Sequence, residues 1–83
     1  MNVRLEFHAH LRRVAGADDV TADVAATTVQ AAVREFAATH AAREALTHPT
    51  VLLLHAGRRV GWDDATPLEN GDVIALHAPI AGG

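Results

Sequence analysis

The sequence contains no cysteine, no lysine and no tyrosine, and among its 83 residues there are only two phenylalanines and one tryptophan. Without cysteine the chain cannot form a disulfide framework, a thiolate metal site or a cysteine nucleophile. Because aromatic residues are so few, the hydrophobic core must be built mainly from alanine, valine and leucine. A chain of this length is expected to form one domain.

Positive charge and long apolar runs are also scarce. Seven basic residues stand against ten acidic ones, which gives a net charge of −3 and argues against the basic face that nucleic acid or an anionic membrane requires. No apolar run approaches the ~18 residues of a membrane span. The first residues lack the basic start and apolar stretch of a signal peptide. We therefore expect a cytoplasmic protein that binds neither nucleic acid nor membrane.

The first quarter of the chain has the pattern of two strands joined by a helical turn. Apolar and polar residues alternate over residues 2–9, which predicts a half-buried strand. Helical spacing follows for about one turn and is closed by Gly16. Alternation resumes at residues 20–24, which predicts a second strand that returns alongside the first.

An amphipathic helix is predicted over about residues 28–40. Its apolar stripe has the spacing i, i+3, i+4, i+7 and i+8 and consists of Val29, Ala32, Val33, Phe36 and Ala37. Thr27 and Gln30 are three residues apart, which predicts a capping box at the start of the helix. Phe36 is expected to be almost fully buried against the sheet. Residues 41–48 allow a loose turn or a short second helix, which Pro49 ends.

The second half of the chain contains three further strand signals. The continuous apolar run 51–54 predicts a central strand covered on both faces. A tight turn at Ala56-Gly57 leads into a short edge strand at residues 59–62, and the last strand covers residues 73–77. The resulting order, β-β-α-β-β-β, predicts an α+β fold in which one mixed sheet of about five strands packs on one main helix.

Two segments resemble a known family. Residues 67–83, PLENGDVIALHAPIAGG, resemble the C-terminal signature P-L-x-x-G-D-x-V/I of the MoaD/ThiS-type ubiquitin-like sulfur carriers, which ends in G-G. Residues 7–16, FHAHLRRVAG, resemble the family's first strand and turn, and Thr28-Val29 is typical of its helix start. The resemblance covers essentially the whole chain and is strongest to the small subunit of molybdopterin synthase. It implies the β-grasp fold, with the first and last strands adjacent at the centre of the sheet.

The resemblance also implies a chemistry at the end of the chain. A MoeB/ThiF-type, ubiquitin-activating-like adenylyltransferase would use ATP and magnesium to adenylate Gly83, which then becomes a thiocarboxylate. A larger synthase subunit would receive the sulfur for molybdopterin-type cofactor synthesis. The chain itself is then a substrate with no catalytic residue and no cofactor of its own. Residues 1–78 form the domain and residues 79–83 a flexible tail, in which Pro79 sets the exit direction and Ile80, Ala81 and Gly82 lead to the reactive end.

A partner surface is expected beside the root of this tail. If Ile74 and Leu76 point toward the core, the alternate residues of the last strand point outward. His8 lies on the corresponding face of the first strand. We therefore predict that Ala75, His77 and His8 bind the partner; the alternative is an ordinary exposed sheet face.

The histidines and the acidic pairs are the remaining candidates for a metal or catalytic site. His8 and His10 share one face of the predicted first strand, and His77 would neighbour them if the first and last strands pair, so Zn²⁺ or Ni²⁺ binding has to be considered. No carboxylate or cysteine completes an obvious set, which favours surface histidines and no metal. The pairs 18–19 and 63–64 are expected to be solvated, with no acid or base role.

Two other functions keep the fold and change the role of the chain. The first is a ubiquitin-like modifier whose end becomes joined to lysines of other proteins. The second is a plain β-grasp interaction module in which Gly82-Gly83 is incidental. The pathway that would receive sulfur is left open by the sequence, because related carriers serve thiamine and amino-acid synthesis as well.

Overall fold

The computed structural model describes residues 1–78, and the predicted tail lies outside these described residues. The elements are β1 (Asn2–Phe7), α1 (His10–Ala15), β2 (Asp19–Asp23), α2 (Val29–Ala38), α3 (Arg43–Leu46), β3 (Leu52–His55), β4 (Arg58–Val60) and β5 (Val73–His77). None of the three helices in this part of the chain has the length and apolar character needed to cross a bilayer.

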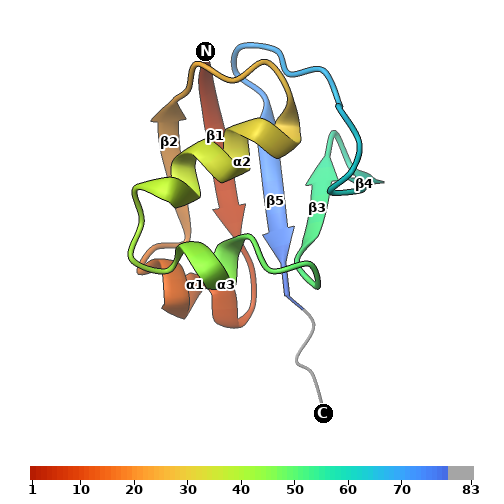
Figure 1. Ribbon diagram of the computed structural model, residues 1–83. Helices are drawn as coiled ribbons and strands as arrows, with labels where there is room; N and C mark the ends of the chain where they lie inside the picture. Colours follow the sequence, from red (N-terminus) through yellow and green to blue (C-terminus); the bar gives the residue numbers. More distant parts are fainter. Residues whose placement is uncertain (79–83) are drawn as a thin grey trace.

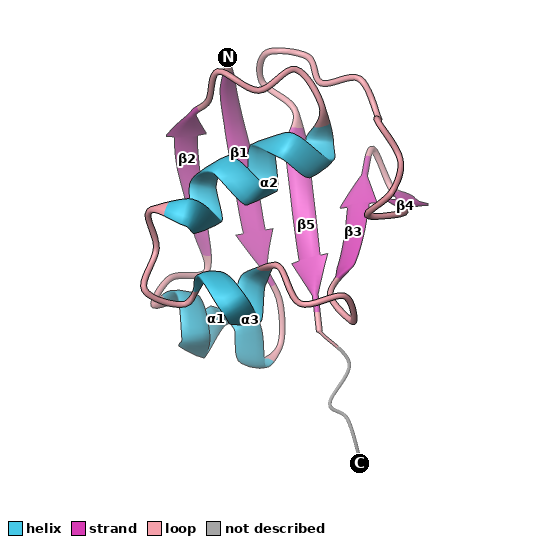
Figure 2. Ribbon diagram, in the orientation of Figure 1, coloured by secondary structure: helices cyan, strands magenta, loops and turns pink. Residues whose placement is uncertain are grey.

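The five strands form one mixed sheet in the order β2-β1-β5-β3-β4. β1 and β5 run parallel, whereas the β1–β2, β3–β5 and β3–β4 pairs are antiparallel. The main helix α2 crosses one face of the sheet, and the short helices α1 and α3 lie together at the end where β1 and β5 finish (Figures 1 and 2). This confirms the predicted β-grasp arrangement, with β1 and β5 adjacent and β5 in the middle.

The core lies between α2 and the sheet face that the helix covers. Alternate residues of β1 and β5 are fully buried there, and Leu5 and Ile74 are both 0% exposed. The other buried apolar residues include Val3, Phe7, Leu11, Val29, Ala32, Val33, Ala37, Leu46, Leu53 and Leu76. Except for Phe7 these are aliphatic, so the core has the composition that the scarcity of aromatic residues predicts.

The start of α2 differs from the predicted capping box. Thr28, and not Thr27, is the N-cap, and its side chain accepts a hydrogen bond of 3.2 Å from the backbone N–H of Ala31. Gln30 does not fold back to the cap, because its side chain is buried with 1% exposure and bonds to the distant segment after β4. These partners outside the helix replace the local one, so the capping-box prediction is wrong.

Phe36 also departs from its prediction. It is half-buried, and its ring lies 6.1 Å from that of Phe7 and 5.6 Å from that of His40. Val33 and Ala37 take the positions of α2 that face the sheet most directly, with 1% exposure each. Phe36 is therefore at the margin of the helix–sheet interface instead of inside it.

The apolar run at residues 51–54 is not a central strand covered on both faces. β3 is the fourth strand in the sheet order; Leu53 is buried, whereas Leu52 and Leu54 are half-buried on the face opposite α2. The middle position belongs to β5, which lies between β1 and β3. β4 is shorter than predicted and ends at Val60, so that Trp62 lies in the turn that follows.

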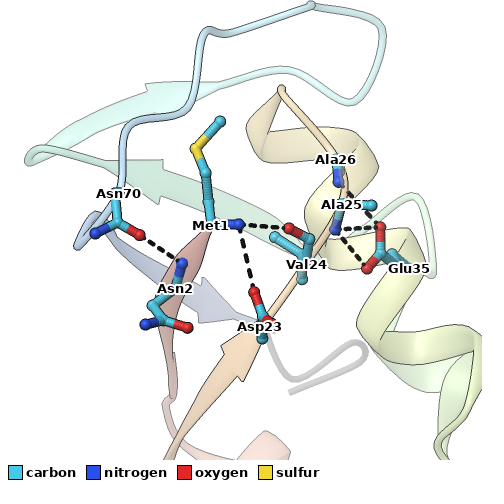
Figure 3. Close-up of polar contacts among 8 residues, drawn as sticks. All are labelled: Met1, Asn2, Asp23, Val24, Ala25, Ala26, Glu35 and Asn70. Carbon is cyan, nitrogen blue, oxygen red and sulfur yellow. Dashed lines mark hydrogen bonds and ion pairs between the residues drawn. The ribbon is translucent and has the colours of Figure 1, made fainter.

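The connection between β2 and α2 is held by a side chain of the helix. The Glu35 carboxylate accepts hydrogen bonds from the backbone N–H groups of Ala25, at 2.9 Å, and Ala26, at 3.1 Å (Figure 3). The backbone nitrogen of Met1 donates to the carbonyl of Val24 at 2.7 Å in the same region. The Glu35 bonds tie the segment after β2 to α2, and the Met1 bond ties the same segment to the start of the chain.

Candidate functional site

The candidate site lies at the end of β5, where the described chain approaches the predicted tail. In the parallel β1–β5 pair, Phe7 is opposite Leu76, so the next residues, His8 and His77, lie side by side. Their rings are stacked, with centroids 4.1 Å apart and planes 6° from parallel. The prediction that pairing of the first and last strands brings His8 beside His77 is confirmed.

Burial and the second ring lower the pKa of His77. Desolvation is the larger cause, because the protonated form loses contact with water, and the nearby His8 adds electrostatic repulsion. The Nε2 atom of His8 lies 3.9 Å from the Glu6 carboxylate. At neutral pH the His77 ring is therefore held in its neutral form.

The stacked pair has the wrong geometry for a shared metal ion. The lone pairs of ring nitrogens lie in the ring planes, and two parallel planes 4.1 Å apart do not meet at one ion. His10 does not share the face of His8 as expected, because β1 ends at Phe7 and the positive φ of Ala9, 54°, turns the chain into α1. In residues 1–78 no three His, Cys, Asp or Glu side chains form a potential metal site.

The sheet face opposite α2 forms an apolar strip beside the histidine pair. We call it the outer face; it consists of Val73, Ala75, His77, Leu52 and Leu54. In the β3–β5 register Ala75 is opposite Leu54 and His77 is opposite Leu52. Val73 is 42% exposed and the other four are half-buried. The outward placement of the alternate β5 residues is confirmed, whereas partner binding by Ala75, His77 and His8 stays a prediction.

Charged side chains border the outer face with opposite sign on its two flanks. On the β1 flank, the Arg4 guanidinium lies 2.9 Å from Asp19 and 3.8 Å from Glu6, so two carboxylates share one cation. On the β3–β4 flank, Arg59 is paired with Leu54 and is exposed. A protein that docks on this face in one orientation would present a basic group to the first flank and an acidic group to the second.

The two acidic pairs, residues 18–19 and 63–64, each include one residue that bonds to another part of the protein. Asp19 pairs with Arg4, as described above, and Asp64 accepts a hydrogen bond of 2.7 Å from the backbone N–H of Gly61. Each pair thus has one member with a structural partner. All four residues are exposed, so the expectation that both pairs are solvated is confirmed.

Sequence reasoning missed a hydrogen bond between side chains that joins β3 to the turn before β5. The Nε2 atom of His55 lies 2.8 Å from Asp72, and the same carboxylate oxygen accepts from the backbone N–H of Glu69 at 2.8 Å. The hydrogen bond from the Glu69 backbone is the largest cause of a lowered pKa of Asp72, and the bond to His55 is the next. They fix the entry into β5 and hence the position of the outer face. The spacing of His55 and Asp72 in the sequence carries no periodic signal for this contact.

Comparison with known proteins finds similarity among solved structures. No family model and no curated protein matches the sequence. SAMP1 from Haloferax volcanii is 25% identical with a TM-score of 0.83 over 100% of both chains. The HVO 2177 protein of Haloferax volcanii is 29% identical with a TM-score of 0.76, over 100% of this chain and 87% of that one. A putative molybdopterin converting factor subunit 1 from Pyrococcus furiosus is 23% identical with a TM-score of 0.75, over 96% and 99%. These likenesses confirm the β-grasp fold and show that the chain resembles small ubiquitin-like proteins of this kind, among which SAMP1 is named a small archaeal modifier protein.

Proposed function

We propose that this chain, which resembles the MoaD/ThiS-type ubiquitin-like sulfur carriers and shares their fold, carries sulfur as a thiocarboxylate on Gly83. The observation that supports the proposal most is the signature at residues 67–83, because its first part forms the entry into β5 and β5 itself in the middle of the sheet. A carboxyl group placed after Pro79, Ile80, Ala81 and Gly82 extends at most about 14 Å over the last four residues.

The chemistry requires two steps and no side chain of this protein. The Gly83 carboxylate attacks the α-phosphate of ATP, which forms an acyl adenylate and releases pyrophosphate. Sulfide then attacks the acyl carbon and expels AMP, which leaves the thiocarboxylate and one proton. ATP and magnesium belong to the active site of a cytoplasmic adenylyltransferase of the MoeB/ThiF type. The absence of Cβ atoms at Gly82 and Gly83 lets the end of the chain enter a narrow active site.

We further propose that the outer face selects the partners. The end of the chain carries little chemical information, so recognition must come from a surface close to it. Ala75, His77 and His8 are the predicted contact residues, and Leu52 and Leu54 extend the same apolar strip. The adenylyltransferase and the larger synthase subunit would use this strip in turn, since both need the same tail.

Mass spectrometry of the intact protein tests the reaction at Gly83. The starting mass first establishes that Gly83 is the last residue of the expressed chain. With an activating enzyme, ATP and sulfide, the chain is expected to gain the mass that results when sulfur replaces one oxygen. A chain lacking Gly82 and Gly83 is the control and should gain nothing. Failure to detect either an adenylate or a thiocarboxylate on the full chain contradicts the carrier function.

A titration of variants against the activating enzyme tests the docking surface separately. His77→Asp places a charge where binding would remove water, so we expect at least about a tenfold loss of affinity. Ala65→Asp introduces the same side chain at an exposed position in the loop between β4 and β5, which is not part of the outer face, and should bind as the unaltered chain does. If both variants bind with equal affinity, the docking surface does not include His77. The proposal for Gly83 does not depend on this result.

A second candidate function is protein modification, which the likeness to SAMP1 favours. In that case the activated Gly83 acylates a lysine amine and expels AMP. Because this chain has no lysine, every lysine-linked adduct lies on another protein. Protease cleavage after Leu76 leaves residues 77–83 as a branch on the acceptor lysine, and peptide mass spectrometry can find this branch. A plain interaction module would give neither a thiocarboxylate nor such branches, and would keep its binding without the last two residues.

A further inference from the structure

A groove at the β4 edge of the sheet adjoins the outer face and shares Leu52 with it. We call it the Trp62 groove; its volume is about 470 Å³, within the range of pockets that hold ligands. Its lining comes from α2, the α3–β3 connection, β3, β4 and the turn after β4. The lining residues include Arg34, Val51, Leu52, Arg59, Val60 and Trp62. The reaction proposed at Gly83 uses no residue of this groove, although Leu52 also belongs to the outer face and Arg59 borders it.

One hydrogen bond fixes the indole of Trp62, and two more fix the backbone of the turn that carries it. The ring nitrogen donates to the carbonyl of Val51 at 2.9 Å, and the Arg34 guanidinium donates to the carbonyl of Trp62 at 3.2 Å. The same guanidinium lies over the ring, 5.2 Å from its centroid. The buried Gln30 amide holds the preceding carbonyl, that of Gly61, at 2.8 Å. A surface held this firmly has little conformational entropy left to lose on binding.

The rim of the groove is positive although the whole chain has a net charge of −3. Arg34 and Arg59 line the groove and are exposed, and within residues 1–78 Asp63 is the one acidic residue that lines it. An adjoining hollow is lined by Arg34, Arg43 and Glu44, among others. The two hollows together carry three guanidinium groups and two carboxylates. Their surplus of positive charge is complementary to an acidic ligand.

We infer that the Trp62 groove binds an acidic segment of a protein partner that inserts a large apolar side chain. The apolar floor of Leu52, Val60 and Trp62, each half-buried, matches such a side chain, and the guanidinium groups at the rim match flanking carboxylates. A small inorganic anion would leave the floor uncovered. Tryptophan and arginine are also the residues that most often dominate binding energy at protein interfaces.

Trp62 is the only tryptophan of the chain and therefore reports on the groove directly. We would titrate the full chain with the N-acetylated synthetic peptide Glu-Asp-Phe-Asp-Glu and follow tryptophan fluorescence. A saturable change is expected, and it should weaken as salt rises because the charges are exposed. The matched peptide with glutamine and asparagine in place of the acids should produce no saturable change. Absence of saturation with the acidic peptide up to millimolar concentration overturns the inference.

Charge reversal on the rim sharpens the test. Arg59→Glu should weaken binding of the acidic peptide at least about tenfold, since like charges would then face each other. Arg13→Glu reverses an exposed arginine on α1, outside the groove, and should leave affinity nearly unchanged. Equal affinities of the two variants, or full competition by inorganic phosphate, would show that the groove does not recognise an acidic peptide. Self-association of the free chain in sedimentation, lost in Arg59→Glu, would assign the groove to a second copy instead.

Discussion

The two faces of β5 differ in what they contribute to the molecule. Ile74 and Leu76 point toward α2 and are 0% and 1% exposed, whereas Val73 on the outer face is 42% exposed. Ala75 and His77 alternate with the buried pair and are only half-buried. One strand of five residues thus anchors the core with one set of side chains and presents the outer face with the other. The comparison predicts that stability depends on the first set and recognition on the second.

The largest effect is expected from truncation on the inner face. Leu76→Ala should cost about 2–5 kcal/mol of unfolding free energy, because it leaves a cavity under α2. Val73→Ala on the outer face should change the same quantity by less than about 0.5 kcal/mol. Urea denaturation followed by circular dichroism measures both. Similar losses for the two variants would show that the outer face carries as much of the stability as the inner face.

Phe36→Ala should fall between these extremes. The ring is half-buried at the margin of the helix–sheet interface, so its removal is expected to cost about 2 kcal/mol, roughly half the value for a fully buried phenylalanine. The same denaturation experiment applies. A loss as large as that of Leu76→Ala would place the ring inside the core, where the apolar stripe of α2 had predicted it.

Periodic signals were sufficient for the parts of the fold that depend on local geometry. The bounds of β5 agree with the alternation at residues 73–77, and Gly16 ends α1 with the positive φ of 80° that its position predicts. The capping box failed because Gln30 bonds to Gly61 and Thr66, which are 31 and 36 residues away. A local pattern contains no information about partners at that distance.

Only part of the candidate site could be predicted from the sequence. Adjacent first and last strands place His8 beside His77, and this followed from the resemblance. Leu52 and Leu54 were missed on the outer face because a continuous apolar run does not reveal that β3 has only one covered face. The Trp62 groove depends on the conformation of the turn after β4, which no periodic pattern describes.

Gln30 provides a test of whether its buried hydrogen bonds hold the turn that forms the Trp62 groove. Its side chain donates to the Gly61 carbonyl and accepts from the backbone N–H of Thr66 at 3.0 Å. Gln30→Leu keeps the volume but leaves these groups without partners, so we expect a loss of about 1–3 kcal/mol. The fluorescence of Trp62 should shift to longer wavelength as the turn loosens. An unchanged spectrum with unchanged stability would show that Gln30 does not hold the groove.

The smallest effect is expected from protonation of the histidine pair on the outer face. The pKa of His77 is lowered in the folded protein, so the unfolded chain binds the proton more tightly, with a pKa near the ordinary 6.5. The stability contributed by neutral His77 is therefore complete above this value and decreases as the pH falls below it, until the lowered pKa of the folded state is reached. Glu6, Arg12, Asp18 and Asp19 are the charged residues among those that line the hollow beside His8.

Two variants separate this titration from other groups. Melting temperatures measured between about pH 7.5 and pH 5 should fall less in His77→Gln than in the unaltered chain, because glutamine does not titrate. His8→Gln removes the electrostatic repulsion but not the burial, so its pH dependence should lie between the two. The lowered pKa of Asp72 acts at lower pH, near and below 3.8, where its stabilising bonds are lost. If His77→Gln loses stability as steeply as the unaltered chain, the stacked pair is not the group that titrates, and the outer face is insensitive to pH.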